Sequence, residues 1–237
     1  MLPDYPGADR SRVRGLVLPV LLYRGPVWRV DGEGVRSRLV AQPDWTLDLS
    51  ASGAFRSRDN PAREGMPPLD WLVGLGPQLV WHGWREAPGR PTLHLKARAL
   101  LSTDGRDWHG RGHVLEPEVR WHWTAPLPGG PGRLSFGVQP TWASEALHRY
   151  FYEVAPSQAT GRRPAWDARA GYFGTEVKLT LGRRESQALS WFVTARALSL
   201  HGAANEGSPL AKEGLNWTVG LGLVWTPWRS AETVPAR

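Results

Sequence analysis

The chain has 237 residues, a formal net charge of +7, fourteen tryptophans and no cysteine. It contains no run of eighteen apolar residues, so the sequence predicts no transmembrane helix. The lack of cysteine excludes a disulfide framework or a thiolate metal site. The arginines are scattered singly rather than gathered in one run, and this pattern is not typical of a nucleic-acid-binding protein.

Residues 3–7 form a predicted turn, and period-two hydrophobic stretches then alternate with turn-forming segments. The tetrapeptide at 31–34, Asp-Gly-Glu-Gly, is typical of a hairpin tip. Eleven strands are predicted, at residues 16–23, 27–30, 35–41, 45–55, 69–81, 93–101, 115–123, 134–142, 172–181, 189–197 and 215–225.

The strand at 69–81 carries the clearest pattern. Its odd positions are apolar, including Trp71, Leu75 and Trp81, and most of its even positions are polar or small, such as Asp70 and Gly74. It is longer than the usual five- or six-residue strand. A long strand that is apolar on one face and bounded by indoles is typical of a membrane-spanning barrel.

The connections between the strands alternate in length. Those at 56–68, 102–112, 144–167 and 201–213 are predicted to be long, and those at 83–91, 126–132 and 182–186 to be short. Long outer loops and short periplasmic turns are characteristic of outer-membrane barrels. The sequence therefore predicts an all-β fold, an antiparallel transmembrane β-barrel of 10–12 strands that forms a single domain over residues 1–237.

A soluble β-sandwich or lipocalin-like barrel is the alternative, because its strands alternate as well. In that case the apolar face points inward and the charged face points to water. In the membrane interpretation nine tryptophans face lipid, namely Trp45, Trp71, Trp81, Trp121, Trp123, Trp142, Trp191, Trp217 and Trp225.

Several short motifs occur in order along the chain: PDYPG at 3–7, LP at 18–19 with YRG at 23–25, NPAREGMP at 60–67 with LGP at 75–77, YFYEV at 150–154, GYFGT at 171–175 and SPL at 208–210. As an ordered set they resemble the MipA/OmpV family. The resemblance implies an outer-membrane β-barrel that acts as a scaffold between a lytic transglycosylase and a penicillin-binding murein synthase. Other members of the family are similar to adhesins or porin-like proteins.

The family resemblance also implies a strand before the PDYPG turn. We expect this first strand to be missing here, which makes residues 1–12 the remnant of a loop, and residues 229–237 a C-terminal tail. No signal peptide is visible at the start of the chain. The expected location is the cell outer membrane.

The other face of the predicted strands carries the ionisable groups. With a loop centred on residues 106–108, Arg98 would lie opposite Glu116, and Lys96 opposite Glu118, which favours stabilising cross-strand pairs. Because a barrel of this size is not much wider than one that side chains fill, we expect a lumen occupied by charge with at most a narrow water path. The predicted network comprises His94, Lys96, Arg98, Glu116, Glu118, Arg120, His122, Glu176, Lys178 and Arg196.

Catalysis and metal binding are weaker interpretations of the same residues. Glu116 and Glu118 lie on one face of one strand, whereas glycosidase carboxylates flank the scissile bond from two sides. His109 and His113 lack the further ligands that a metal needs. We therefore expect no enzyme activity, no cofactor and no metal.

Arginines in the long loops are candidates for contact with lipopolysaccharide phosphate, which guanidinium groups bind well. These candidates are Arg56, Arg58, Arg63, Arg162 and Arg163. The expected partners are outer-membrane lipid, lipopolysaccharide and murein-processing enzymes. The alternatives to a scaffold are a narrow diffusion pore or adhesin, or an outer-membrane enzyme.

Overall fold

The computed structural model describes residues 1–15, 28–31 and 34–225. Its longer strands are β3 (Trp28–Asp31), β4 (Gly34–Ala41), β5 (Trp45–Ala54), β6 (Trp71–Trp81), β7 (Thr92–Thr103), β8 (Trp108–Leu127), β9 (Gly130–Ala143), β10 (Gly171–Arg184), β11 (Leu189–Ser199) and β12 (Leu215–Trp225). The remaining elements are β1 (Leu2–Pro3), β2 (Ser11–Arg12), α1 (Glu145–Tyr152) and the 3₁₀ turns η1 (Pro61–Arg63) and η2 (Pro156–Gln158).

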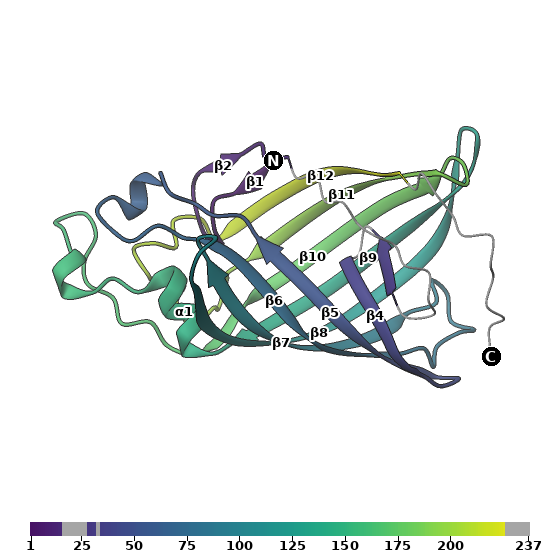
Figure 1. Cartoon of the computed structure of the whole chain (residues 1–237), viewed down its shortest axis with the longest axis horizontal. Coiled ribbons are helices and arrows are strands. Elements are labelled where there is room, and N and C mark those ends of the chain that lie inside the picture. The colour runs from purple at the N-terminus through teal and green to yellow at the C-terminus, as the bar shows by residue number, and fades with distance from the viewer. Residues whose placement is uncertain (16–27, 32–33, 226–237) are drawn as a thin grey trace.

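The ten longer strands form one antiparallel sheet in which each strand pairs with its neighbours in the chain, from β12 at one edge to β3 at the other. The sheet curls into a barrel, with α1 and the long connections gathered at one end (Figure 1). Among the described residues no pairing joins β12 to β3. At the β12 edge, Met1 exchanges two backbone hydrogen bonds with Val219. The predicted all-β, antiparallel fold is confirmed.

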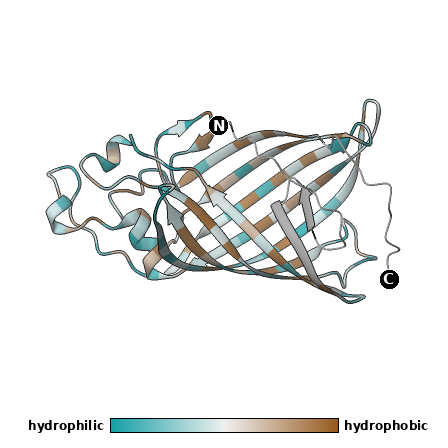
Figure 2. Cartoon of the chain, in the orientation of Figure 1, coloured by the Kyte–Doolittle hydropathy of each residue, from teal (hydrophilic) through white to brown (hydrophobic). Residues whose placement is uncertain are grey.

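Side-chain exposure follows the predicted alternation. Along β7, exposed and buried side chains alternate. Leu93 and Leu95 are 37% and 44% exposed, whereas the residues that follow each of them, His94 and Lys96, are 2% and 7% exposed. The hydropathy colouring shows the same banding along the other strands (Figure 2). The sheet therefore turns its apolar face outward and its charged face inward, which is the reverse of a soluble barrel.

All nine predicted tryptophans lie on the outer face of the sheet, at two levels. Six lie toward the end with short connections, namely Trp45, Trp81, Trp121, Trp123, Trp191 and Trp225. Trp71, Trp142 and Trp217 lie toward the end that carries α1. At each level, tryptophans lie next to aromatic residues of the neighbouring strand. Trp45 pairs with Trp81 toward the end with short connections, and Trp142 contacts Tyr172 toward the end that carries α1.

The predicted strands from residue 45 onward are confirmed, and so is the β3–β4 hairpin. The strand predicted at 16–23 and the tail at 229–237 lie outside the described residues. The long loop predicted at 102–112 is wrong, because β7 and β8 continue to a four-residue turn at 104–107. Asp104 accepts hydrogen bonds from the backbone N–H groups of Arg106 and Asp107 there, and Gly105 takes a φ of 105°. His109 and His113 consequently lie on β8 rather than in a loop.

The face predicted for Phe173 is also wrong. A β-bulge between Tyr172 and Gly174 inserts Phe173 as an extra residue on β10. An inserted residue changes the face on which the neighbouring side chains lie. Phe173 therefore points inward, where it is 7% exposed, although Val177 and Leu179 lie on the outer face as predicted.

The segment predicted to be irregular at 144–167 contains α1. Arg149 makes ion pairs with Glu145 and Glu153, one turn away on each side, and such i,i+4 pairs support a short helix. Leu147, His148, Phe151 and Tyr152 are the buried residues of α1. Within the described part of the chain, none of the helices is long and apolar enough to cross a membrane.

Candidate functional site

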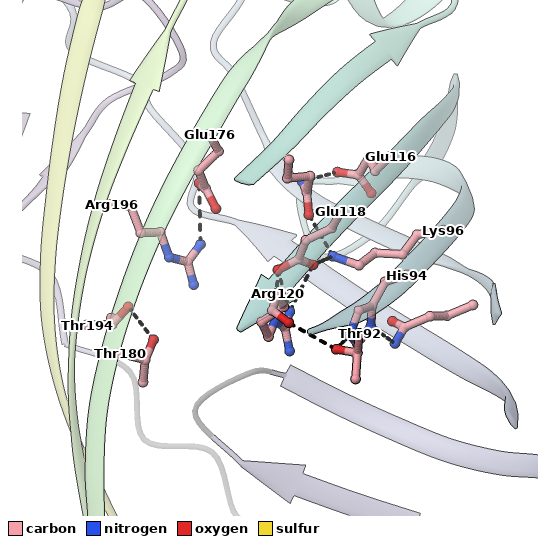
Figure 3. A network of polar contacts seen from close by, with 12 residues as sticks. Thr92, His94, Lys96, Glu116, Glu118, Arg120, Glu176, Thr180, Thr194 and Arg196 are labelled. Carbon is pink, nitrogen blue, oxygen red and sulfur yellow. Dashed lines mark hydrogen bonds and ion pairs between the residues drawn. The ribbon is translucent and has the colours of Figure 1, made fainter. Parts of the chain in front are cut away.

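The inner faces of β7 and β8 hold a cluster of buried charges (Figure 3). Lys96 is ion-paired with Glu118, and Arg98 with Glu116. Arg120 donates from Nε to Oε1 of Glu118 over 2.8 Å. Glu118 and Arg120 are only 2% and 3% exposed, so each charge is held by a partner rather than by bulk water.

The predicted register of this hairpin is wrong by two residues. Lys96 lies directly opposite Glu116, and Arg98 lies opposite Val114. The ion pairs between Lys96 and Glu118 and between Arg98 and Glu116 are therefore diagonal contacts, which long side chains can reach across neighbouring strands.

Neutral side chains that the sequence analysis left out join these charges. Gln139 on β9 accepts from Lys96 Nζ over 2.6 Å and donates to Glu116 over 3.1 Å. Gln78 and Thr92 contact the two ring nitrogens of His94 at 3.1 and 2.9 Å. All three lie on the inward face, and the period-two alternation places them there together with the ionisable groups.

The remaining predicted members continue along the same inner face. Glu176 lies 3.9 Å from Arg196, and Lys178 is opposite Arg196 in the β10–β11 register. Figure 3 shows Glu176 and Arg196 beside the β7–β8 cluster, and Thr180 and Thr194 nearby, which are hydrogen-bonded at 3.2 Å. His122 is opposite Ser135. The structure thus brings β7 to β11 together around one polar interior.

This arrangement fits a packed charge network better than a catalytic pair. Glu116 and Glu118 both have cationic partners and an amide or second guanidinium in contact. A general acid and base need a substrate between them. In the described part of the chain, no cluster of three or more His, Asp or Glu side chains is placed to hold a metal ion.

A lid fills the end of the barrel that carries α1. Its apolar core joins the N-terminal turn, α1 and the ends of five strands, and consists of Tyr5, Ala8, Leu69, Leu72, Leu100, Val114, Ala143, Leu147, Phe151, Tyr152, Ala168 and Phe173. Leu72, Leu100 and Phe173 point inward from the strands. Apolar side chains therefore fill the interior at this end of the barrel.

Hydrogen bonds connect the N-terminal turn to the rest of the lid. Asn216 accepts from the backbone N–H of Gly7 at 2.5 Å and donates to the carbonyl of Ala8 at 3.0 Å. Tyr5 and Tyr152 donate to the carbonyl groups of Leu210 and Pro6. Burial raises the pKa of Tyr5 to about 12 and that of Tyr152 further, so both hydroxyl groups remain protonated donors.

The loop arginines divide into two groups. Arg56, Arg58 and Arg162 are exposed. Arg163 is 8% exposed, and its guanidinium donates to the carbonyl groups of Ala62, Glu64 and Gln158. The prediction that Arg163 contacts lipopolysaccharide is therefore wrong, because its donors are used within the protein. Arg63 is half-buried and donates to the carbonyl of Phe151.

Together these features define a class of protein: an antiparallel β-barrel with an apolar exterior, aromatic residues at two levels, a charged interior and a packed lid at one end. The chain belongs to the family described as MltA-interacting protein MipA, whose family model matches residues 1–227. Comparison with curated proteins and comparison with solved structures each give no match.

Proposed function

We propose that this protein spans the outer membrane as a single barrel and serves there as a non-enzymatic scaffold for murein-processing enzymes. The apolar outer face of the sheet is the main support for a location in the membrane. The most exposed side chains of β12, Leu221, Leu223 and Trp225, are 70–72% exposed, and such a surface in water would be an aggregation site. The two levels of tryptophan match the aromatic girdles at the two interfaces of a bilayer.

Connection length suggests the orientation. Apart from the four-residue turn at 104–107, the lid end holds long connections, at 55–70, 144–170 and 200–214, whereas the other end holds shorter ones at 82–91, 128–129 and 185–188. Because long loops of outer-membrane barrels face outward and short turns face the periplasm, we propose that the lid faces outside. The short turns would then face the compartment that contains murein.

The closed interior favours a scaffold over a diffusion pore. A solute would have to pass the apolar core of the lid and then the buried ion pairs that Lys96 and Arg98 form on the inner wall of the barrel. Removing one partner of a buried ion pair is costly, so the network resists opening. The family description supplies the partner class, a lytic transglycosylase of the MltA type. At the lid end, the exposed Arg56, Arg58 and Arg162 are our candidates for contact with lipopolysaccharide.

A binding assay tests the scaffold role. The barrel is reconstituted in nanodiscs and used to capture a purified lytic transglycosylase and a purified bifunctional murein synthase. We expect capture by the wild-type barrel, and loss of capture when residues 83–91 are replaced by a tight Asn-Gly turn. The matched control replaces the turn at 104–107, at the lid end, and should bind normally. Equal capture by all three barrels, or capture by none, would contradict the proposal.

A further inference from the structure

A cavity of about 280 Å³ opens among the connections at the lid end, separate from the charge network of the lumen. It lies between the loop before β6, the beginning of β8, and α1 with the turn that follows. Three arginines line it, Arg63, Arg111 and Arg149, together with Tyr150. Its apolar wall is Met66, Pro67 and Pro68.

Arg111 is held in place by contacts that leave part of its guanidinium without hydrogen bonds to the described residues. Its guanidinium carbon lies 4.4 Å from the ring centroid of Tyr150, and its Nε donates to Ser102 Oγ over 2.8 Å. Tyr150 is itself fixed by a hydrogen bond from its hydroxyl to the carbonyl of Asp70. The two terminal nitrogens of Arg111 donate to no acceptor among the described residues, which leaves them available at the cavity.

Arg63 adds a second positive charge on the same side. Its Nη1 donates to the carbonyl of Phe151 over 2.9 Å, and its guanidinium lies over the ring of Tyr5 at 5.8 Å. Burial lowers the pKa of Arg63; the neighbouring Tyr5 and Tyr150 partly oppose this, and the positive charge of Arg163 adds to it. In the part of the chain that the structure describes, neither Arg63, Arg111 nor Arg163 forms an ion pair with a carboxylate. An anion in the cavity would compensate this buried charge.

Arg149 differs from Arg63 and Arg111 because carboxylates already compensate its positive charge. It is ion-paired at 2.9 Å with Glu145 and at 2.9 Å with Glu153. Glu153 also lines the cavity and repels an anion from that side. The favourable position for an anion is therefore between Arg63 and Arg111, with the Met66–Pro68 wall left for the uncharged part of a ligand.

We propose that this cavity binds a phosphate monoester through Arg63 and Arg111. A doubly charged tetrahedral group suits two guanidinium groups that lack carboxylate partners, and guanidinium–phosphate hydrogen bonds are among the strongest in proteins. The phosphate monoester can belong to a lipid headgroup or to a small soluble molecule, and both present the same chemistry to the arginines. The site is independent of any contact with murein enzymes at the other end of the barrel.

Calorimetric titration of inorganic phosphate into the full chain tests the site, with the barrel held in phosphatidylcholine nanodiscs. We expect saturable binding that Arg111→Gln weakens by roughly tenfold or more, because it removes a charge-assisted donor. Arg111→Lys keeps the charge but loses the planar fork, and an intermediate affinity is expected. Arg106→Gln is the matched control: it removes one exposed positive charge from the same end and should leave the affinity unchanged. Arg63 is not substituted, because it also holds the end of α1.

The source of the phosphate is tested by competition. If nanodiscs that contain phosphatidic acid suppress the binding of inorganic phosphate, the ligand is borne by lipid; if binding persists unchanged, the ligand is soluble. Either result supports the site. Absence of saturable binding to the wild-type chain would overturn it, and so would equal weakening by Arg106→Gln and Arg111→Gln. A failed capture of murein enzymes would leave these results unaffected.

Discussion

Asn205 donates a hydrogen bond from Nδ2 to Nδ1 of His148 over 2.8 Å, and this contact determines which ring nitrogen of His148 is protonated. The amide oxygen of Asn205 accepts from the indole of Trp166 and from the backbone N–H of Arg169, both at 3.1 Å, which fixes the orientation of the amide. Nδ1 of His148 must therefore be an acceptor, and Nε2–H donates to the carbonyl of Gly171. A second proton on the ring would oppose the Asn205 donor.

The lid should consequently loosen in acid. Burial lowers the pKa of His148 from its usual value, although the bond to Gly171 partly opposes this. The neutral ring contributes its full stability above the unfolded pKa of about 6.5, and that stability is lost as the pH falls through the lowered folded pKa. Amide exchange of α1 and of residues 203–206, corrected for the intrinsic effect of pH, should accelerate between about pH 7.5 and about pH 5.

Two variants make this measurement specific. His148→Gln should remove most of the pH dependence, whereas His109→Gln, at an exposed position on β8, should leave it as in the wild type. Exchange in α1 that is equally fast at both pH values would show that His148 does not control the lid.

The diagonal ion pair between Arg98 and Glu116 should behave as a buried pair. Arg98→Met leaves the carboxylate of Glu116 without its cation, and we expect a loss of about 3 kcal/mol in the free energy of unfolding. Arg98→Met with Glu116→Leu should recover a large part of this loss, because no charge of the pair is then stranded. Urea titration in detergent, followed by tryptophan fluorescence, measures both changes. The exposed Glu86→Gln is the control, and additive effects of the two substitutions would argue against the contact.

The strands were more predictable than the contacts between them, for physical reasons that this hairpin illustrates. Period-two alternation sets the face of each side chain, so the inward position of Lys96 and Glu118 follows from the sequence. The register depends on where the hairpin closes, which is between Gly105 and Arg106 rather than at Asp107, and on a bulge between Ala99 and Leu101. Neither the turn position nor the bulge leaves a periodic signal.

The lid was the least predictable part, because tertiary packing decides its structure. At eight residues, α1 is too short to be stable by itself, and the segment around it is rich in turn-forming residues. The NPAREGMP motif at 60–67 could be recognised in the sequence, but its contact with Arg163 could not. Arg163 is buried because it donates to the carbonyl groups of Ala62 and Glu64, about a hundred residues earlier in the chain. The sequence gives no direct indication of such contacts.

The contact of Asn216 with the N-terminal turn should hold the lid in place. Asn216→Leu removes both hydrogen bonds to the turn and leaves the N–H of Gly7 and the carbonyl of Ala8 buried without partners, at a cost of about 1–3 kcal/mol each. We expect faster trypsin cleavage after Arg10 or Arg12. Thr218→Ala, two residues along the same face of β12, is the control, and equal cleavage rates in both variants would show that Asn216 does not anchor the turn.

The packed interior should make the barrel a poor conductor. In planar bilayers the wild-type chain is expected to give no steady ohmic steps, because the lid core fills one end of the barrel and buried ion pairs line the inner face beyond it. Conductance recorded at several salt concentrations tests this expectation. Reproducible steps that scale with salt would restore the diffusion pore as the better function.

Single spin labels show whether apolar side chains face lipid and polar side chains face the lumen, and they can be placed freely because the chain has no cysteine of its own. Leu179 and Thr180 are adjacent on β10 and are 45% and 7% exposed. Leu179→Cys and Thr180→Cys are labelled in lipid vesicles, and their collisions with oxygen and with a water-soluble nickel chelate are compared. We expect the label at 179 to be relaxed strongly by oxygen and hardly by nickel, and the label at 180 to be relaxed much less by oxygen. A label at 179 that responds mainly to nickel would show that this face of the sheet meets water rather than lipid.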